Sequence, residues 1–154
     1  MFSHLIINVN ELYTDTLAHK RKRIIMTTTD LSLEKIYNLA IKTLKHNGCD
    51  ELNAEAVANT VTNAERDGSV SHGLFRIPGY VAALKSKKVK GNARPTNNFL
   101  TQNAIRVEGD YGFAPTAIGI GIPALVDVTK KHGVGVLTIT NTHHFAALWH
   151  ETEA

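Results

Sequence analysis

Four side chains that could do chemistry lie close together in the stretch "SVSHGLFRIPGY" (residues 69–80). They are Ser71, His72, Arg76 and Tyr80, and the last three have the spacing i, i+4 and i+8, which would place them on one face of a helix. Histidine changes charge near neutral pH, and an arginine fork binds a carboxylate or phosphate with two hydrogen bonds. The stretch is therefore either a solvated surface or the wall of a site that binds an anion.

Proline indicates where the helix of this stretch begins. Pro78 lacks an N–H group, which only the first turn of a helix can spare. We therefore expect a regular helix from near Phe75, entered through a turn made by residues 71–73, with Ser71 and His72 near its positive end, where anions are favoured. His72 alone could be a packing or surface histidine. Arg76 is costly to bury without an anionic partner, and this cost favours a functional site for the group.

A second set of polar residues follows the run "VGVLTIT" (134–140), which is β-branched and typical of a buried strand. Asn141, Thr142, His143 and His144 come directly after it. Ligands of α/β sheets bind at the carboxyl ends of strands. His144 is therefore a second candidate for a site residue.

Two further patterns are weaker. "GIGIPA" (119–124) resembles the start of a dinucleotide fingerprint, but a helical pattern precedes it and Pro123 stands where the phosphate-binding helix would continue. We expect its glycines to allow close helix packing instead. A possible metal-ligand group consists of His143, His144, His150 and Glu151. Because its spacing matches no zinc motif, we expect no metal.

Apolar residues with a helical period predict the elements that must position these side chains. We expect one helix from a cap at Asp30 or Ser32 to Gly48, and a second from a cap at Asn53 to Gly68. A third lies within residues 71–87. A fourth begins at Pro115 and ends at Gly133 after the basic residues 130–132.

The remaining segments complete an alternation of helices and strands. Residues 86–98 are polar and contain Gly and Pro, which predicts a loop. Residues 104–112 are expected to form a short strand that runs into a Gly-Asp turn, and residues 146–151 another helix. This alternation is typical of an α/β sheet.

Composition limits the class of protein. The chain has 154 residues, of which 43% are hydrophobic and 20% charged, as expected for a globular domain or a piece of a larger one. The single cysteine, Cys49, excludes an internal disulfide framework and a cysteine zinc cage. No apolar run approaches the roughly 20 residues that span a bilayer. We expect a cytoplasmic protein with no membrane partner.

Residues 1–25 differ from the rest of the chain. They contain the basic run "HKRKR" (19–23), and without them 13 basic and 12 acidic residues remain, so the body has no electrostatic footprint for a nucleic acid. They show no sustained periodicity and no signal-peptide pattern. We expect a disordered or mis-assigned extension, with Met26 as the natural start.

The segments "SHGLFRIPGY" and "GVGVLTITNTHHFAALW" together resemble the type-2 malate/L-lactate dehydrogenase family. The family includes ureidoglycolate and sulfolactate dehydrogenases and Δ1-piperideine-2-carboxylate reductases. The resemblance covers about residues 30–152 and includes "VEGDYGFAPTA". It implies an α/β fold in which N-terminal helices (26–98, with the substrate segment 71–80) lead into the first, incomplete part of a non-Rossmann NAD(P)-binding domain (99–154).

The resemblance also implies an activity. It is that of an NAD(P)H-dependent oxidoreductase that interconverts 2-hydroxy or 2-amino acids with 2-oxo or cyclic 2-imino acids, using NADPH or NADH. The full-length protein is expected to be a homodimer that acts on a small molecule.

Site residues follow from the same resemblance, position by position. His72 and His144 match catalytic positions, and Ser71, Arg76 and Tyr80 match substrate-binding positions. His72, Thr142 and His144 match positions that bind the cofactor. Arg76 suits the substrate carboxylate, and either histidine suits proton delivery or carbonyl polarisation.

The chain departs from the family at two points. Many members have glycine after "HF", where this chain has Ala146, and "HFAALW" is most similar to the cyclic-imine reductase branch. Family members are also longer, so we expect these 154 residues alone to be inactive and prone to aggregate.

Two other functions stay open at this stage. The chain could be a non-enzymatic α/β module that binds a small carboxylate through Arg76 and the histidines. It could also bind nucleic acid through residues 19–23, with a steep dependence on salt.

Overall fold

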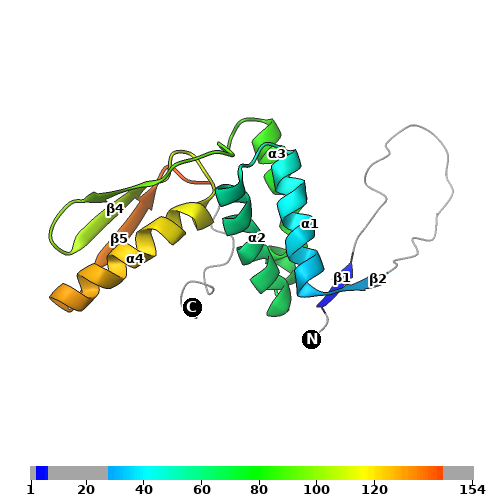
Figure 1. The fold of residues 1–154 in the computed structure, drawn as a ribbon, viewed down its shortest axis with the longest axis horizontal. Helices are drawn as coiled ribbons and strands as arrows, with labels where there is room; N and C mark the ends of the chain where they lie inside the picture. The colour runs from blue at the N-terminus through cyan, green and yellow to red at the C-terminus, as the bar shows by residue number, and fades with distance from the viewer. Residues whose placement is uncertain (1–2, 7–27, 144–154) are drawn as a thin grey trace, which may run out of the picture.

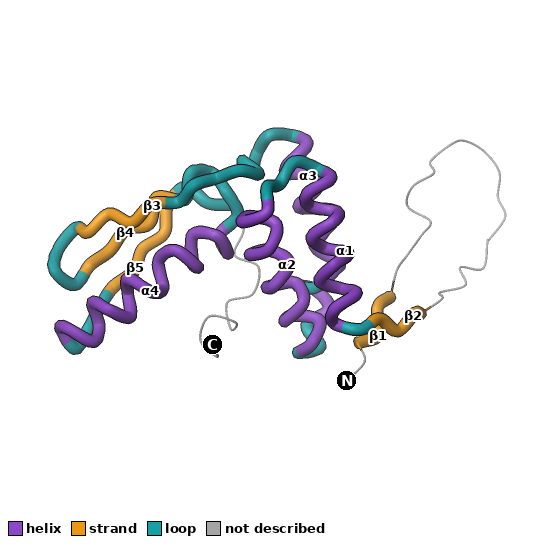
Figure 2. Tube along the Cα trace, in the orientation of Figure 1, coloured by secondary structure: helices purple, strands orange, loops and turns teal. Residues whose placement is uncertain are grey.

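The computed structural model describes residues 3–6 and 28–143 (Figure 1). Helices α1 (Leu33–His46), α2 (Glu51–Arg66) and α3 (Ile77–Lys85) form one half. The other half contains strands β3 (Thr96–Phe99), β4 (Ala104–Glu108) and β5 (Val136–Thr140). Helix α4 (Ala114–His132) connects β4 to β5 along the chain. Figure 2 shows the two halves side by side, joined by loops. This mixed arrangement confirms the predicted fold class.

Helices α1 and α2 form where the periodicity predicts them. Ser32 caps α1 by accepting a hydrogen bond from the Lys35 N–H at 3.3 Å. Helix α2 begins earlier than expected, because Asp50 is its cap and accepts from the Asn53 N–H at 3.1 Å. The predicted Asn53 cap is therefore wrong, and Asn53 is fully buried inside the helix.

The main core lies between the first three helices. Its buried members include Ile36, Leu44, Val57, Tyr80 and Phe113. Phe113 precedes α4, so this core reaches from the helical half to the sheet half.

The third helix starts later than the sequence predicts. Two 3₁₀ turns, η2 (Val70–His72) and η3 (Leu74–Arg76), precede α3, and Gly73 between them has φ −83° and ψ −140°. The expected start near Phe75 is wrong, and so is the single helical face for His72, Arg76 and Tyr80. A 3₁₀ turn has three residues per turn, and the non-helical Gly73 interrupts the helical path.

The sheet has the order β3-β4-β5. β3 pairs antiparallel with β4, and β4 pairs parallel with β5. β3 begins at Thr96, inside the segment predicted to be a loop, because pairing with β4 overrides its polar composition. β5 is alternately exposed and half-buried, which corrects the expectation of a buried strand, because among the described elements α4 packs on one face of the strand, at Leu137.

Helix α4 contains the whole "GIGIPA" segment, and Gly133 ends it with φ 79°. A Cβ on Gly121 would lie 2.8 Å from Val107 of β4, so the glycine allows close packing on the sheet. The expected packing role is confirmed for Gly121, whereas a Cβ on Gly119 would meet nothing within 4 Å. No helix in the described residues is long and apolar enough to cross a membrane.

Within residues 1–25, Ser3–Ile6 form strand β1, which pairs antiparallel with β2 (Thr28–Leu31). Residues 1–2, 7–27 and 144–154 lie outside the described part. The predicted extension and the predicted helix over 146–151 therefore stay predictions.

Candidate functional site

The turns η2 and η3 hold the first group of predicted site residues. Backbone hydrogen bonds run from the His72 N–H to Ser69 O (2.9 Å) and from the Arg76 N–H to Gly73 O (3.0 Å). Ser71 is exposed, and its Oγ lies 2.8 Å from Nδ1 of the half-buried His72. If the hydroxyl donates, the ring proton is on Nε2, which suits proton transfer to or from a ligand.

Arg76 and Tyr80 form the deeper part of this group. Arg76 is half-buried, and its Nε is buried without a hydrogen-bond partner among the residues described. Tyr80 is 4% exposed. Burial raises the pKa of its phenol, and the nearby positive charge of Arg76 opposes that rise. The phenol therefore stays neutral at ordinary pH, and a guanidinium donor is available for an anion.

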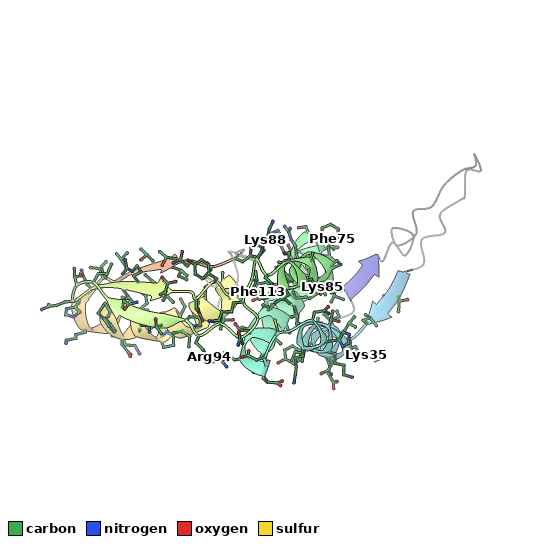
Figure 3. The ribbon with its side chains drawn as sticks, turned by 90° about the horizontal axis from the view of Figure 1, so that it is seen from above. Lys35, Phe75, Lys85, Lys88, Arg94 and Phe113 are labelled. Carbon is green, nitrogen blue, oxygen red and sulfur yellow. The ribbon has the colours of Figure 1, made fainter. Side chains whose placement is uncertain are left out.

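Phe113 connects this group to the strand end that holds the second. The Tyr80 and Phe113 rings meet edge to face with centroids 5.2 Å apart, and Phe113 and His143 do the same at 6.3 Å. The His143 N–H donates to Gly112 O at 2.8 Å, and the Ala114 N–H donates to His143 O at 3.2 Å. Figure 3 shows Phe113 where the two halves meet. The fold thus brings Tyr80 and His143 to the same aromatic ring.

Phe113 has no role predicted from the sequence, and His143 is predicted only as a member of the polar set after the strand. The only signal for Phe113 was its place in the segment "VEGDYGFAPTA". Thr142 is half-buried, and a Cβ on Gly109 would overlap its methyl group, so the two backbones approach closely here. His144 follows His143 directly but lies outside the described residues.

The turn after β4 is held by charged and polar groups. Asp110 and Tyr111 have positive φ (51° and 55°), as does Asn141 after β5 (53°). The Tyr111 N–H donates to Asn141 O at 2.8 Å, which ties the two strand ends together. Lys90 Nζ donates to both oxygens of Asp110, at 2.9 and 2.7 Å. This bond, with one from the Arg94 N–H, lowers the pKa of Asp110.

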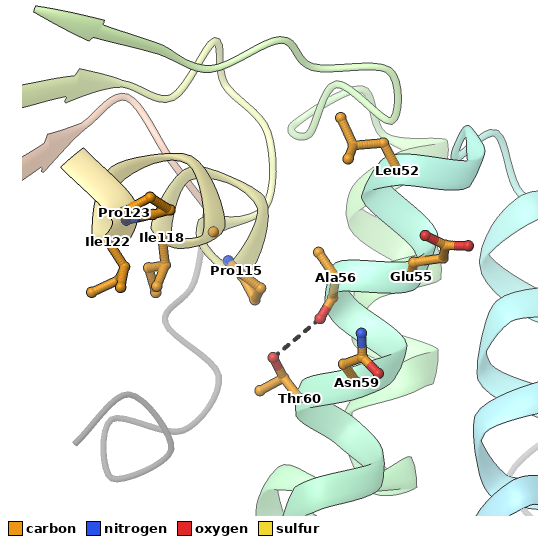
Figure 4. Close-up of a pocket in the computed structure, with 10 residues that line it drawn as sticks. Leu52, Glu55, Ala56, Asn59, Thr60, Pro115, Ile118, Ile122 and Pro123 are labelled. Atoms are coloured by element: carbon orange, nitrogen blue, oxygen red, sulfur yellow. Dashed lines mark hydrogen bonds between the residues drawn. The ribbon is translucent and has the colours of Figure 1, made fainter. Parts of the chain in front are cut away.

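A groove of about 510 Å³ lies between α2 and α4 (Figure 4). Its walls include Leu52, Ala56, Pro115, Ile118 and Ile122. None of the predicted site residues lines it, and its Thr60 hydroxyl donates to Ala56 O at 3.2 Å within the same helix. The groove is therefore separate from the candidate site. No group of three or more potential metal ligands occurs in the part of the chain that the structure describes.

Comparison with known proteins shows the family to which the chain belongs. The family model described as malate/L-lactate dehydrogenase matches residues 31–154. The chain belongs to the malate/L-lactate dehydrogenase family. This confirms the resemblance carried by the two motifs.

The similar members of this family include reductases of cyclic imino acids. The chain is 41% identical to a Δ1-pyrroline-2-carboxylate reductase of Ancylobacter novellus and 39% identical to Δ1-pyrroline-2-carboxylate reductase 1 of Burkholderia ambifaria. Each match covers 80% of this chain and 36% of the relative. The chain therefore spans about a third of the length of these malate/L-lactate dehydrogenase family members.

Solved structures of the malate/L-lactate dehydrogenase family show the same fold. The Δ1-piperideine-2-carboxylate reductase of Pseudomonas syringae superposes with a TM-score of 0.77 at 36% identity, covering 80% of this chain and 37% of that one. Sulfolactate dehydrogenase of Methanocaldococcus jannaschii gives 0.74 at 27% identity, covering 80% and 36%. The described fold is thus part of the fold of this family.

Proposed function

We propose that the complete protein is an NAD(P)H-dependent reductase of a cyclic 2-imino acid, Δ1-pyrroline-2-carboxylate or Δ1-piperideine-2-carboxylate. The observation that carries this proposal is the buried Nε of Arg76, which has no protein partner among the described residues, beside a motif shared with a family of known reductases. The names of the similar relatives support cyclic 2-imino acids over 2-oxo acids as the substrate.

Arg76 is proposed to hold the substrate carboxylate. A guanidinium can donate two parallel hydrogen bonds to a carboxylate, and a partly buried position strengthens them because water competes less. Tyr80, buried beside Arg76, would form the floor of this subsite and Ser71 its rim. In this proposal the ring of the substrate would lie toward Phe113 and the strand end.

Reduction of the C=N bond needs a hydride on carbon and a proton on nitrogen. A nicotinamide cofactor, when bound, supplies the hydride. His72 or His144 would supply the proton, and the Ser71 contact at Nδ1 prepares His72 to act through Nε2. The residues fit a cofactor, because Ser71, His72 and Thr142 are exposed or half-buried hydrogen-bonding groups. We propose that His72, Thr142 and His144 contact it.

Three finer points belong to the same proposal. The cofactor is NADPH or NADH, the complete protein is a homodimer, and it works in the cytoplasm. The single buried cysteine, Cys49, is compatible with a reducing compartment, and burial raises the pKa of its thiol to about 11, with Asp50 adding to the rise.

The test uses the protein encoded by the complete gene. Oxidation of NADPH and NADH is followed with the two cyclic imines, pyruvate and oxaloacetate. Arg76→Ala should lower kcat/KM for the preferred substrate about 100-fold, since a charge-assisted pair is worth up to ~3 kcal/mol. The kcat/KM of Arg76→Lys should lie between those of the wild type and of Arg76→Ala, because lysine keeps the positive charge but lacks the two-pronged guanidinium.

Arg106→Ala is the matched control, because Arg106 is exposed on β4. A folded protein without turnover on any of these substrates would overturn the proposal. Binding of a carboxylate that no nicotinamide cofactor affects would favour the non-enzymatic module.

A further inference from the structure

Glu65 is a buried carboxylate to which the proposed reaction gives no role. It lies in the last turn of α2 and is 1% exposed. Its Oε1 accepts a hydrogen bond from the Leu74 N–H at 2.7 Å. Leu74 begins η3, the turn that ends at Arg76, and the first N–H groups of a helical turn have no partner inside it. Glu65 therefore supplies from α2 an acceptor that η3 lacks.

The same carboxylate packs directly against Gly73, in the space that a Cβ at this position would occupy. A Cβ on Gly73 would overlap the Glu65 carboxylate and lie 2.7 Å from its Cγ. Only glycine leaves room for this side chain. Gly73 is the single residue between η2, which ends at His72, and η3, which ends at Arg76. Glu65 therefore contacts the backbone at the point where the positions of His72 and Arg76 are set relative to each other.

We propose that Glu65 is a positioning residue, whose carboxylate fixes the Gly73–Leu74 backbone and thereby places Arg76 and His72 for the substrate. The inference rests on the proposed function of those two residues. A buried, hydrogen-bonded carboxylate is rigid, and displacement of a binding group by about 1 Å can cost a large factor in rate. Glu65 acts through Arg76 and His72 and does not touch the substrate.

The experiment compares three variants of the complete protein. Glu65→Ala removes the acceptor and should raise KM for the cyclic imine about tenfold, with a smaller change in kcat, because carboxylate binding suffers first. Glu65→Gln keeps an oxygen acceptor of the same length and should restore KM to within about threefold. Glu55→Ala is the matched control, since Glu55 is exposed on the same helix.

A double variant separates positioning from general stability. If Glu65 acts through Arg76, Glu65→Ala should change KM little in an Arg76→Ala background, because the two effects share one pathway. Glu65→Asp, one methylene shorter, serves if the alanine variant does not fold, and should give an intermediate KM. Wild-type KM in folded Glu65→Ala protein, or additive effects in the double variant, would overturn the proposal.

Failure of the proposed function is recognised separately. It would appear as absent turnover in the wild-type protein. Amide hydrogen exchange of the peptide that contains Leu74–Arg76 then tests Glu65 directly. Glu65→Ala should speed its exchange about tenfold, Glu65→Gln should not, and peptides of α1 should be unaffected. Unchanged exchange in Glu65→Ala would overturn the positioning role whatever the substrate.

Discussion

Gly73 and Gly79 lie on either side of Arg76, and their surroundings differ sharply. A side chain at Gly73 would overlap Glu65, whereas a Cβ at Gly79, inside α3, would meet nothing within 4 Å. Gly73→Ala should therefore destabilise the protein by about 2 kcal/mol through a forced shift of a buried side chain. Gly79→Ala should stabilise it by up to about 1 kcal/mol, because alanine favours helix.

The measurement is the free energy of unfolding of both variants in denaturant. Equal effects of the two substitutions would show that the fit of Glu65 against Gly73 does not determine the path of this segment.

At the same scale, residue types could be predicted but their local geometry could not. Ser71, His72, Arg76 and Tyr80 were recognisable because such groups are rarely placed together without a reason. The 3₁₀ turns were not, since they depend on a hydrogen bond from Leu74 to Glu65, nine residues earlier in the chain. Phe113 was missed because an isolated aromatic residue before a helix looks like ordinary core.

At the scale of elements, Asn53 joins the helical half to the sheet half. Its Nδ2 donates to Asp50 Oδ1 (2.8 Å) and Ala93 O (3.1 Å), and its Oδ1 accepts from the Thr116 hydroxyl (3.0 Å). Asn53→Ala should cost about 2–3 kcal/mol, because it leaves buried groups of two other segments unpaired.

Asn59→Ala is the matched control for Asn53, since Asn59 is exposed on the same helix. It should change stability by less than about 0.5 kcal/mol. Thermal unfolding of the two variants measures the difference, and equal melting temperatures would contradict the joining role of Asn53.

Asp110 ties the loop before β3 to the turn after β4, and this tie depends on pH. The hydrogen bonds from Lys90 and from the Arg94 N–H lower its folded pKa below the ordinary 3.8. A lowered carboxyl pKa stabilises the fold above the unfolded pKa, and this stability is lost as the pH falls through the folded pKa. The melting temperature of the Asp110→Asn variant should therefore be lower than that of the wild type at pH 7. The difference between the two melting temperatures should shrink below pH 3.8.

Asp127→Asn, a change at an exposed carboxylate of α4, is the matched control. A constant difference between Asp110→Asn and wild type from pH 7 to strongly acidic pH would contradict this account. Added salt should also reduce the difference in melting temperature between Asp110→Asn and the wild type at neutral pH. The Lys90 side chain is about half exposed, so salt screens its attraction to Asp110.

Element prediction succeeded where local signals were complete. Apolar periodicity, Ser32 and Gly133 marked α1 and the end of α4, since these signals act within one or two turns. β3 was missed because its residues "TNNF" become a strand only through pairing with β4. The Asn53 cap was wrong because Asp50, three residues earlier, takes the same role with a charged carboxylate acceptor.

At the scale of the molecule, apolar side chains gather at one end of the sheet. Phe99, Leu100, Val134 and Val136 are each more than half exposed. The Leu100 N–H donates to Ala104 O, and Ala104 pairs with Val136, so Leu100 and Val136 lie at the same end of the sheet. β5 also has one strand edge that no described element pairs with. Such edges and patches favour association with other chains.

We therefore predict that the 154-residue chain alone self-associates and does not oxidise NAD(P)H, whereas the protein from the complete gene is monodisperse and active. Size-exclusion chromatography and the nicotinamide assay measure both. Val136→Lys in the short chain should reduce association, because a charge on an edge strand opposes pairing with another strand. It should not restore activity, since it supplies none of the length by which the relatives exceed this chain. A monodisperse short chain with cofactor turnover would contradict the prediction, and would show that these 154 residues carry a complete site.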